Sequence, residues 1–515
     1  MYLIASAAYV NEELRNEVGK IPPSFLPLRN QRLFMHQIST FCPTESVYLT
    51  IPEDFLIDEF DDYLLKSLNV ELIKIPLNLS LGESIYKALS VIDRFDDGLK
   101  ILHGDTFVGD VPMSSDDFIV ASQIIDDYEW SGLLSKTDLG LYMSGFFSFS
   151  DLKLFYSLLR ENSYNFVQSV NKYCLEVNSK IVKSTLWLDL GHISTYYRSR
   201  AHMPGKRHFN SIEIDSKVVL KQSIDNEKIR AEFNWFLNVP LSIKYYTPQI
   251  VSVNDTEDKA SYKLEYLCHL PLNELFVYGK QPLFKWKRIF ESCKEFLDAC
   301  GVCKPSSAAD FLDQGLFLEK TYKRLSEFYR DNEFTNRPLF YGGIALGSLE
   351  EIAVEVSKFI PNATSECISI LHGDFCFSNI LYDFRKCDIK VIDPRGISVN
   401  GNQSIYGDQR YDYSKLAHSV IGLYDFIIAE RYYLEVEDNN YLIKFPENIE
   451  IGEVQNLFWT YFLKDERNCN VDKKYLYASM IHLFISMLPL HRDSRQRQSA
   501  LIANSLRLYL EFNKL

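Results

Sequence analysis

The sequence predicts two folded parts in tandem, an α/β domain with a mostly parallel sheet followed by a domain of different, α+β pattern. The chain has 515 residues, which is more than a single hydrophobic core usually supports, because domains average roughly 150 residues. Short apolar runs alternate with helix-length segments up to residue 205, which is typical of a parallel sheet with crossover helices. Beyond residue 205 the pattern changes to a hairpin and a helix. We therefore expect domains at 1–205 and 206–515.

Composition excludes several classes of protein. Hydrophobic residues make up 46% of the chain and aromatic residues 14%, as in a folded, core-rich protein. The formal charge of −14 argues against nucleic acid as a partner, because proteins that bind it usually present a basic face. The apolar opening is too short for a secretion signal, and no apolar run approaches about 18 residues. We expect a cytoplasmic protein without membrane insertion.

The cysteines predict reduced thiols. Ten cysteines are sparse in a chain of this length. The only close pair, Cys300 and Cys303, has no second pair at zinc-site spacing.

Two carboxylates of the first domain follow predicted strands. The strand-like runs are YLIASAAYV, SVYLTIP, VELIKIP and LKILHGDTFVGDV, with WLDLGH later. Asp105 ends the run KILHGD, and ligands collect at the carboxyl ends of parallel strands. A lone Gly-Asp after a strand more often only caps a turn. Asp189, however, lies between a second aromatic-rich run and a glycine, and two such carboxylates can hold Mg²⁺ against a phosphate.

Four stretches of the first domain carry a family likeness: Pro22–Ile38, Leu81–Ile85, Gly104–Asp105 and Trp187–Gly191. Together they resemble the nucleotide-diphospho-sugar pyrophosphorylase family, the nucleotidyltransferases that join an NTP to a phosphorylated small molecule. The resemblance implies a Rossmann-like nucleotidyltransferase in which Asp105 and Asp189 bind Mg²⁺. The nucleotide contacts that it implies come from Ala5, Ser6, Ala7 and Gly82.

The first domain also departs from that family. Its first turn, Ala5–Tyr9, has no glycine to let phosphate approach, and Pro23 stands where the family has a phosphate-neutralising lysine. Lys20 is a candidate substitute for that lysine. Other candidates near the second carboxylate are Lys183, Arg198 and Arg200. Two possibilities stay open, an active nucleotidyltransferase or a degenerate domain that binds a nucleotide or a partner.

The second domain begins with a lysine on a strand and a glutamate on a helix. Asn210–Lys221 predicts a hairpin with Asp215–Ser216 near its turn, and residues 226–237 predict an amphipathic helix that carries Glu232. Kinases use a strand lysine and a helical glutamate to hold the phosphates of ATP. Taken alone, Lys221 and Glu232 would more often be solvated surface residues.

A second group of polar residues favours the kinase interpretation. Asn379 follows Asp374 by five residues, and Asp393 closes an apolar strand. Phosphoryl transfer needs a carboxylate that accepts the proton of the attacking hydroxyl, together with oxygen ligands for Mg²⁺. Asp374 fits the first need, and Asn379 and Asp393 fit the second.

This spacing and the later segment Gly407–Ser419 resemble the aminoglycoside phosphotransferase and choline kinase family, over roughly residues 207–515. The resemblance implies a protein-kinase-like fold with lobes of about 206–275 and 276–515, in which Asp374 accepts the proton of the attacking hydroxyl and Lys221 holds the phosphates of ATP. We expect His372 to support its loop by hydrogen bonding. Arg395 could meet an anionic substrate or form a surface salt bridge.

The pentapeptide ILHGD occurs twice, at Ile101–Asp105 and Ile370–Asp374, and the flanking sequences diverge at once. We interpret the match as convergent. The sequence thus predicts a bifunctional, Mg²⁺-dependent enzyme for a bacterial capsule or surface polysaccharide precursor. It would phosphorylate a small-molecule alcohol (a sugar, polyol or amino-alcohol) with ATP and couple the product to CTP or UTP. The acceptor, the choice of NTP and the oligomeric state are left open.

Overall fold

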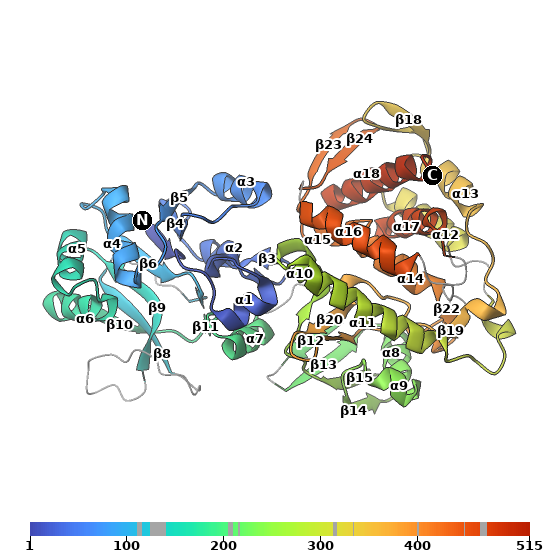
Figure 1. Ribbon diagram of the computed structural model, residues 1–515, viewed down its shortest axis with the longest axis horizontal. Helices are drawn as coiled ribbons and strands as arrows, with labels where there is room; N and C mark the ends of the chain where they lie inside the picture. The colour runs from blue at the N-terminus through green and yellow to red at the C-terminus, as the bar shows by residue number, and fades with distance from the viewer. Residues whose placement is uncertain are drawn as a thin grey trace. The chain divides into compact units, whose positions relative to one another are not determined.

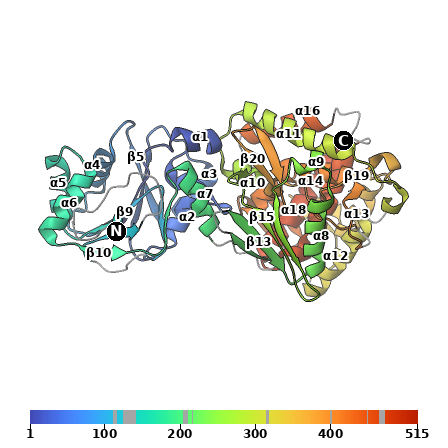
Figure 2. The same ribbon diagram turned by 90° about the horizontal axis from the view of Figure 1, so that it is seen from below.

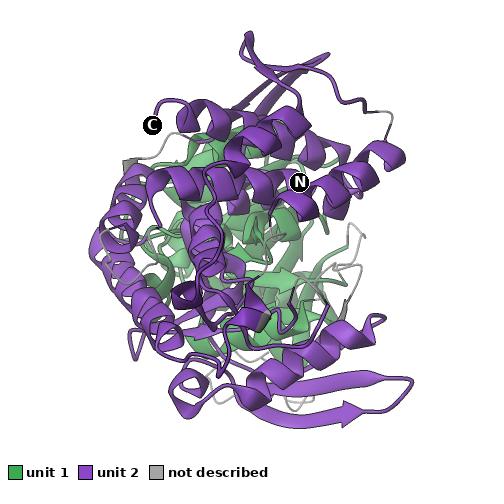
Figure 3. Cartoon of the chain, turned by 90° about the vertical axis from the view of Figure 1, so that its right-hand side faces the viewer, with its two compact units in different colours: residues 1–203, 278–280 green, residues 204–277, 281–515 purple. Residues whose placement is uncertain are grey.

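The computed structural model describes residues 1–110, 116–123, 141–203, 210–214, 217–312, 317–332, 334–398, 401–446, 449–463 and 471–515 (Figure 1). The chain divides into two compact units (Figure 3). The first consists of Met1–Met203 and Tyr278–Lys280, and the second of Pro204–Val277 and Gln281–Leu515.

A seven-stranded sheet forms the centre of the first unit. Its strands are β1 (Tyr2–Ala5), β4 (Val47–Pro52), β5 (Val70–Ile75), β6 (Leu99–His103), β8 (Phe118–Gln123), β9 (Leu141–Phe149) and β10 (Lys180–Lys183). They lie in the order β10-β8-β9-β6-β1-β4-β5. All neighbours are parallel except β9, which runs antiparallel to both β6 and β8. The predicted α/β fold with a mostly parallel sheet is confirmed.

Helices α4 (Leu81–Ile92), α5 (Leu152–Glu161) and α6 (Phe166–Val177) cover one face of this sheet (Figure 1). They bury Leu89, Phe155 and Val170 against alternate strand residues such as Leu3 and Ile101. The remaining elements of the unit are α1 (Glu12–Val18), η1 (Pro23–Phe25), β2 (Pro27–Leu28), β3 (Gln31–Arg32), α2 (Leu33–Ile38), α3 (Glu59–Ser67), β7 (Thr106–Val108), β11 (Trp187–Asp189) and α7 (Ile193–His202).

The predicted strand around Trp187 is not part of the main sheet. It is β11, which pairs antiparallel with β7 in a separate two-stranded sheet. The chain turns at Gly104–Asp105 and leaves the main sheet before β7 begins, so β7 pairs with the distant β11 outside that sheet.

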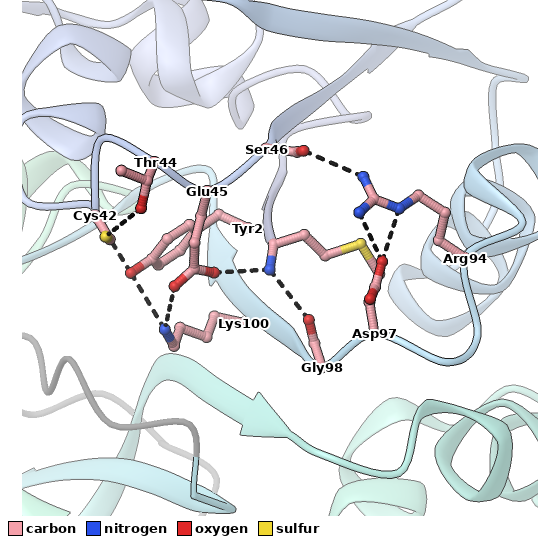
Figure 4. A network of polar contacts seen from close by, with 10 residues as sticks. Tyr2, Cys42, Thr44, Glu45, Ser46, Arg94, Asp97, Gly98 and Lys100 are labelled. Carbon is pink, nitrogen blue, oxygen red and sulfur yellow. Dashed lines mark hydrogen bonds and ion pairs between the residues drawn. The ribbon is translucent and has the colours of Figure 1, made fainter.

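A partly buried ion network joins Met1 at the N-terminus, Glu45 before β4 and Lys100 on β6 (Figure 4). Glu45 accepts a hydrogen bond from the amine of Met1 at 2.7 Å and from Nζ of Lys100 at 2.9 Å. Burial alone would raise the pKa of Glu45, but the two ammonium groups outweigh it and lower that pKa. Nζ of Lys100 also lies 3.4 Å from the hydroxyl of Tyr2.

The second unit begins with a four-stranded antiparallel sheet in the order β12-β13-β15-β14. Its strands are β12 (Asn210–Ile214), β13 (Val218–Ser223), β14 (Ile250–Asp255) and β15 (Ala260–Glu265). The predicted hairpin is confirmed as β12 and β13, and its turn at Asp215–Ser216 lies outside the described residues. Helix α8 (Asn226–Asn238) packs beside this sheet, where the ring of Phe233 contacts that of Tyr262 on β15 (Figure 2). The side chain of Asp225 caps the N-terminus of this helix.

The rest of the second unit is mainly helical, which confirms the predicted α+β, two-lobed fold. Its longer helices are α11 (Leu283–Gly301), α12 (Leu318–Asp331), α14 (Arg410–Val420), α16 (Ile449–Phe462), α17 (Lys473–Ser486) and α18 (Arg495–Phe512). The shorter helices are α9 (Leu241–Lys244), α10 (Leu272–Tyr278), η2 (Ala309–Phe311), α13 (Leu349–Ser357), η3 (Ser365–Cys367), η4 (Phe377–Asn379), α15 (Tyr424–Ile428) and η5 (Leu488–His491). The strands are β16 (Leu270–Pro271), β17 (Leu339–Tyr341), β18 (Ile344–Gly347), β19 (Ile368–Ile370), β20 (Ile380–Asp383), β21 (Asp388–Val391), β22 (Tyr406–Asp408), β23 (Tyr433–Glu437) and β24 (Asn440–Lys444). Within the described ranges, no helix has both the length and the apolar character needed to span a bilayer.

Candidate active sites

The two predicted carboxylates of the first unit lie close together. Asp105 directly precedes β7, and β7 pairs with β11 so that Thr106 lies opposite Asp189. The N–H of Leu190 donates to the carbonyl of Asp105 at 2.8 Å. A Cβ added at Gly191 would lie 2.4 Å from a carboxylate oxygen of Asp105, so Gly191 lets the Asp105 side chain lie close to the backbone that follows Asp189.

Asp189 is buried and is held by the start of α7. Its Oδ2 accepts hydrogen bonds from the hydroxyl of Thr195 and, at 2.9 Å, from Nδ1 of His192. Burial and the negative charge of Asp105 raise the pKa of Asp189. A cation shared by Asp105 and Asp189 would relieve their repulsion, so the donor set suits Mg²⁺, which prefers carboxylate and phosphate oxygens.

The first turn lies beside Asp105. The carbonyl of Ala5 accepts from the N–H of Gly104 at 2.8 Å. The N–H of Ser6 donates to Oγ1 of Thr50 at 2.8 Å, so this amide already has a partner. The hydroxyl of Ser6 accepts from the N–H of Ser24 at 3.0 Å.

The amides that follow Ser6 are the ones this turn offers to a ligand. Within the described part of the chain, the N–H groups of Ala7 and Ala8 have no hydrogen-bond acceptor. Ala7 is half-buried and Ala8 is exposed. A turn with small side chains would leave its backbone open to a phosphate, as glycines do.

Lys20 also lies near the first turn, but its charge is compensated. Its Nζ lies 4.2 Å from the centroid of the Tyr9 ring and 2.9 Å from a carboxylate oxygen of Asp54. The hydroxyl of Tyr9 donates to the other oxygen of Asp54 at 2.6 Å. Lys20 therefore lies beside Tyr9 at the end of the first turn, where Asp54 is its partner.

Gly82 begins a helix instead of forming a separate turn. It lies in the first turn of α4, where Ser80 and Glu83 form a capping box. A Cβ at Gly82 would lie 1.9 Å from the carbonyl oxygen of Tyr164. The lack of a side chain at Gly82 therefore lets the backbone at Tyr164 lie close to the start of α4.

The structure brings Lys221, Glu232 and Asp393 together in the second unit. Nζ of Lys221, on β13, lies 2.6 Å from Glu232 on α8 and 2.9 Å from Asp393 beyond β21. The hydroxyl of Tyr262 donates to the same Glu232 oxygen at 2.8 Å. Burial would lower the pKa of Lys221, but the two carboxylates outweigh it and raise that pKa, so Lys221 is positively charged. Lys221 and Glu232 are thus a buried ion pair, not surface residues.

Asp374 and Asn379 also meet as predicted. Nδ2 of Asn379 donates to the carboxylate of Asp374 at 2.8 Å and to its carbonyl at 2.9 Å. The N–H of Ile392 donates to the carbonyl of Asn379 at 3.0 Å, which brings Asn379 beside Asp393. Asn379 and Asp393 offer oxygen donors only, and these suit Mg²⁺.

Lys415, on α14, is a partner of Asp374 that the sequence did not reveal. Its Nζ lies 2.7 Å from Oδ1 of Asp374. Burial would raise the pKa of Asp374, but Lys415 outweighs that effect and the pKa is lowered. Asp374 is therefore ionised at neutral pH.

Asp412, one helical turn before Lys415, fixes the backbone in front of Asp374. Its carboxylate accepts the N–H groups of His372 and Gly373, each at 2.8 Å. Nδ1 of His372 accepts the N–H of Asp374 at 3.3 Å, which agrees with the predicted supporting role of His372. Asp412 and Lys415 both lie in the segment Gly407–Ser419, whose family resemblance was the only sequence signal near them.

Across the described residues, no group of three or more His, Cys, Asp or Glu side chains could hold a metal ion. Each site instead brings together two protein donors, Asp105 with Asp189 and Asn379 with Asp393. Further ligands would have to come from a nucleotide.

Comparisons with known proteins give likenesses of fold only. No family model matches the sequence, and no curated protein does. One similar solved structure is a putative glucose-1-phosphate thymidylyltransferase from Bacillus anthracis, with 10% identity and a TM-score of 0.32 over 40% of this chain and 96% of that one.

Other similar structures are antibiotic phosphotransferases. Aminoglycoside phosphotransferase APH(4)-Ia has 10% identity and a TM-score of 0.37 over 60% of this chain and 93% of that one. A GDP complex of aminoglycoside 2′-phosphotransferase-IIIa has 14% identity and a TM-score of 0.38 over 60% of this chain and 90% of that one.

Proposed function

We propose that the protein is a bifunctional enzyme, a small-molecule kinase joined to a nucleotidyltransferase. The second unit phosphorylates the hydroxyl of a small molecule with ATP. The first unit couples the phosphorylated product to CTP or UTP and releases pyrophosphate. A nucleotide-activated precursor of a bacterial capsule or surface polysaccharide is the product expected of such a pair.

The observation that carries the kinase proposal is the position of Lys221 between Glu232 and Asp393. A buried lysine held by a helical glutamate suits the phosphates of ATP, because its charge and direction are fixed before the nucleotide binds. Asn379 and Asp393 would hold Mg²⁺, which supplies charge neutralisation at those phosphates.

In the phosphoryl transfer, Asp374 accepts the proton of the acceptor hydroxyl. The hydroxyl oxygen forms a bond to the γ-phosphorus, the bond from that phosphorus to the β,γ-bridging oxygen breaks, and ADP leaves. The lowered pKa of Asp374 supports this role, since the group is ready to accept a proton at neutral pH. Asn379 orients the carboxylate through its 2.8 Å hydrogen bond.

The pairing of Asp105 with Asp189 supports nucleotidyl transfer in the first unit. There a phosphate oxygen of the phosphorylated acceptor attacks the α-phosphorus of CTP or UTP, and pyrophosphate leaves. Asp105 and Asp189 would hold the Mg²⁺ that neutralises the α-phosphate, and the amides of Ala7 and Ala8 would bind phosphate oxygens.

The test measures both products with paired variants. The protein is incubated with ATP, CTP or UTP, Mg²⁺ and a panel of alcohols, and ADP and pyrophosphate are assayed separately. Asp374→Asn should lower ADP formation by about 10²–10⁴-fold, because an amide cannot accept the proton, and should leave pyrophosphate release intact when phosphorylated acceptor is supplied. Asp105→Ala should do the reverse. Loss of both activities in a folded Asp105→Ala variant would contradict the two-site proposal.

The ion pair of Lys20 with Asp54 favours a second candidate for the first unit. Because Asp54 compensates its charge, Lys20 would neutralise the phosphates of a nucleotide less well. The unit would then bind a nucleotide or a partner without catalysis. Under this alternative, CTP or UTP binds to the protein but no acceptor yields pyrophosphate, and Asp105→Ala leaves every measured activity unchanged.

A further inference from the structure

Two cationic side chains of the second unit have no carboxylate partner among the residues that the structure describes. Lys320 lies on α12, and Arg395 lies two residues beyond Asp393. Among the described residues, neither side chain forms an ion pair. Both are half-buried, so solvent and ligands can reach them.

Arg395 lies against the loop that presents Asp374. Its N–H donates to the carbonyl of His372 at 2.8 Å. A Cβ added at Gly373 would lie 2.6 Å from the Cβ of Arg395. Arg395 therefore packs on the residue that immediately precedes Asp374.

Tyr411 joins Lys320 to the same region. Nζ of Lys320 donates to the hydroxyl oxygen of Tyr411 at 3.1 Å, and the Tyr411 ring is buried against Phe317. Burial would raise the pKa of Tyr411, but Lys320, Lys415 and Arg395 outweigh it and lower the pKa to about 8. Because the Tyr411 oxygen accepts from Lys320, its own O–H remains to donate.

The carboxylates in this region already have partners. Asp374 pairs with Lys415, and Asp408 pairs with Arg410 at 2.7 Å. Asp412 is occupied by two backbone amides. Within the described ranges, no carboxylate therefore compensates Lys320 or Arg395, and Arg395 packs against the loop that presents Asp374.

We propose that the acceptor is an anionic alcohol, whose carboxylate or phosphate group is bound by Lys320, Arg395 and the hydroxyl of Tyr411. This inference rests on the kinase function proposed above. The alcohol oxygen gives its proton to Asp374 and takes the γ-phosphoryl group from ATP, while the anionic group stays unchanged and only anchors the substrate. ATP is held at a different lysine, Lys221, so these cations are available to the acceptor.

The test is a binding experiment on the full chain in the presence of Mg²⁺ and the ATP analogue AMP-PNP. Calorimetry at constant ionic strength compares D-glycerate and glycerol 3-phosphate with neutral glycerol and cationic choline. At least one anion should bind, and more tightly than glycerol or choline, and its identity distinguishes a carboxylate site from a phosphate site. Lys320→Ala and Arg395→Ala should each weaken that binding by about ten- to a hundredfold, the effect of one charge-assisted hydrogen bond.

The matched control is Lys323→Ala, an exposed lysine on the same helix, which should leave anion binding unchanged. The inference is overturned if glycerol or choline binds at least as tightly as both anions, or if neither anion binds. It is also overturned if Lys320→Ala and Arg395→Ala weaken AMP-PNP binding but not anion binding. Failure of the kinase function is a separate result, in which AMP-PNP does not bind wild-type protein and no alcohol yields ADP.

Discussion

At the scale of single residues, Lys415 sets the charge of Asp374, and this has a measurable pH dependence. Replacing Lys415 by Met keeps much of its bulk and removes its charge, so burial is opposed only by His372 and Asn379 and the pKa of Asp374 rises. Because Asp374, as the proposed base, must be ionised to accept a proton, the acid limb of kcat/KM should move to higher pH, by about one to three units.

The measurement is the pH–rate profile of ADP formation, with Lys415→Arg as the charge-preserving control. The Arg variant should keep the acid limb near its wild-type position. An unchanged acid limb in the Met variant would show that Asp374 does not act as the base.

At the scale of elements, Gly82 lets the start of α4 dock against the chain at Tyr164. Gly82→Ala places a Cβ 1.9 Å from the Tyr164 carbonyl oxygen, so the helix has to shift. We expect the first unit to lose about 1–3 kcal/mol of stability, as for other overpacked sites. Thermal or urea unfolding of the first unit gives the measurement.

Gly98→Ala is the matched control for this substitution. Its Cβ would lie 3.5 Å from the nearest atom, an ordinary contact, so stability should change little. If Gly82→Ala instead leaves stability intact and weakens CTP or UTP binding, Gly82 contacts the nucleotide, as the family resemblance implies.

The network of Glu45 gives an element-scale prediction with a definite pH sign. The pKa of Glu45 is lowered in the folded protein, so its stabilising effect is present above the unfolded pKa of about 4.3 and disappears as pH falls through the folded value. Glu45→Gln should therefore destabilise the first unit at pH 7 by about 1–3 kcal/mol.

The test is urea unfolding of the wild-type protein and of the Glu45→Gln variant, first at pH 7 and then at successively lower pH. The difference in unfolding free energy should shrink as the solution becomes more acidic. A difference that stays constant with pH would mean that the charge of Glu45 contributes nothing.

Elements that depend on local pattern could be predicted from the sequence. The hairpin before Lys221, helix α8 and the strand before Asp105 were found because their periodicity and turn signals are contained in a few residues. The separate pairing of β11 with β7 could not be found, because it depends on the turn at Asp105 and on a partner far along the chain.

The same distinction holds for the candidate sites. Asp374, Asn379 and Asp393 are recognisable by spacing within one short segment. Lys415 can be recognised as the partner of Asp374 only once α14 is packed against that segment. Tyr262 can likewise be recognised as a partner of Glu232 only once β15 lies beside α8. Asp54, which compensates Lys20, likewise comes from a distant loop whose position no local pattern gives.

At the scale of the whole molecule, the first unit is not one continuous stretch, since it includes Tyr278–Lys280. The buried guanidinium of Arg32 pairs with Asp61 at 2.8 Å and also donates to the carbonyl of Tyr278 at 2.8 Å. The N–H of Lys280 donates to the carbonyl of Val18 at 2.9 Å.

A fragment ending at Met203 should therefore fold but be less stable than the same unit in the full chain. It loses the Tyr278 acceptor, and a buried donor without its partner costs about 1–3 kcal/mol, or roughly 2–10 °C in Tm for a unit of this size. Hydrogen exchange of peptides from residues 1–203 compares the two forms. Equal protection in fragment and full chain would contradict the prediction.

The contribution of Tyr278–Lys280 to the first unit also constrains how the gene can recombine. A single crossover near the codon for Met203 would exchange residues 1–203 for those of another protein but keep the old codons for Tyr278–Lys280. The incoming counterpart of Arg32 would then meet a carbonyl segment selected for a different partner. Functional chimaeras should need replacement at both places, so the two coding regions are expected to be inherited as one block.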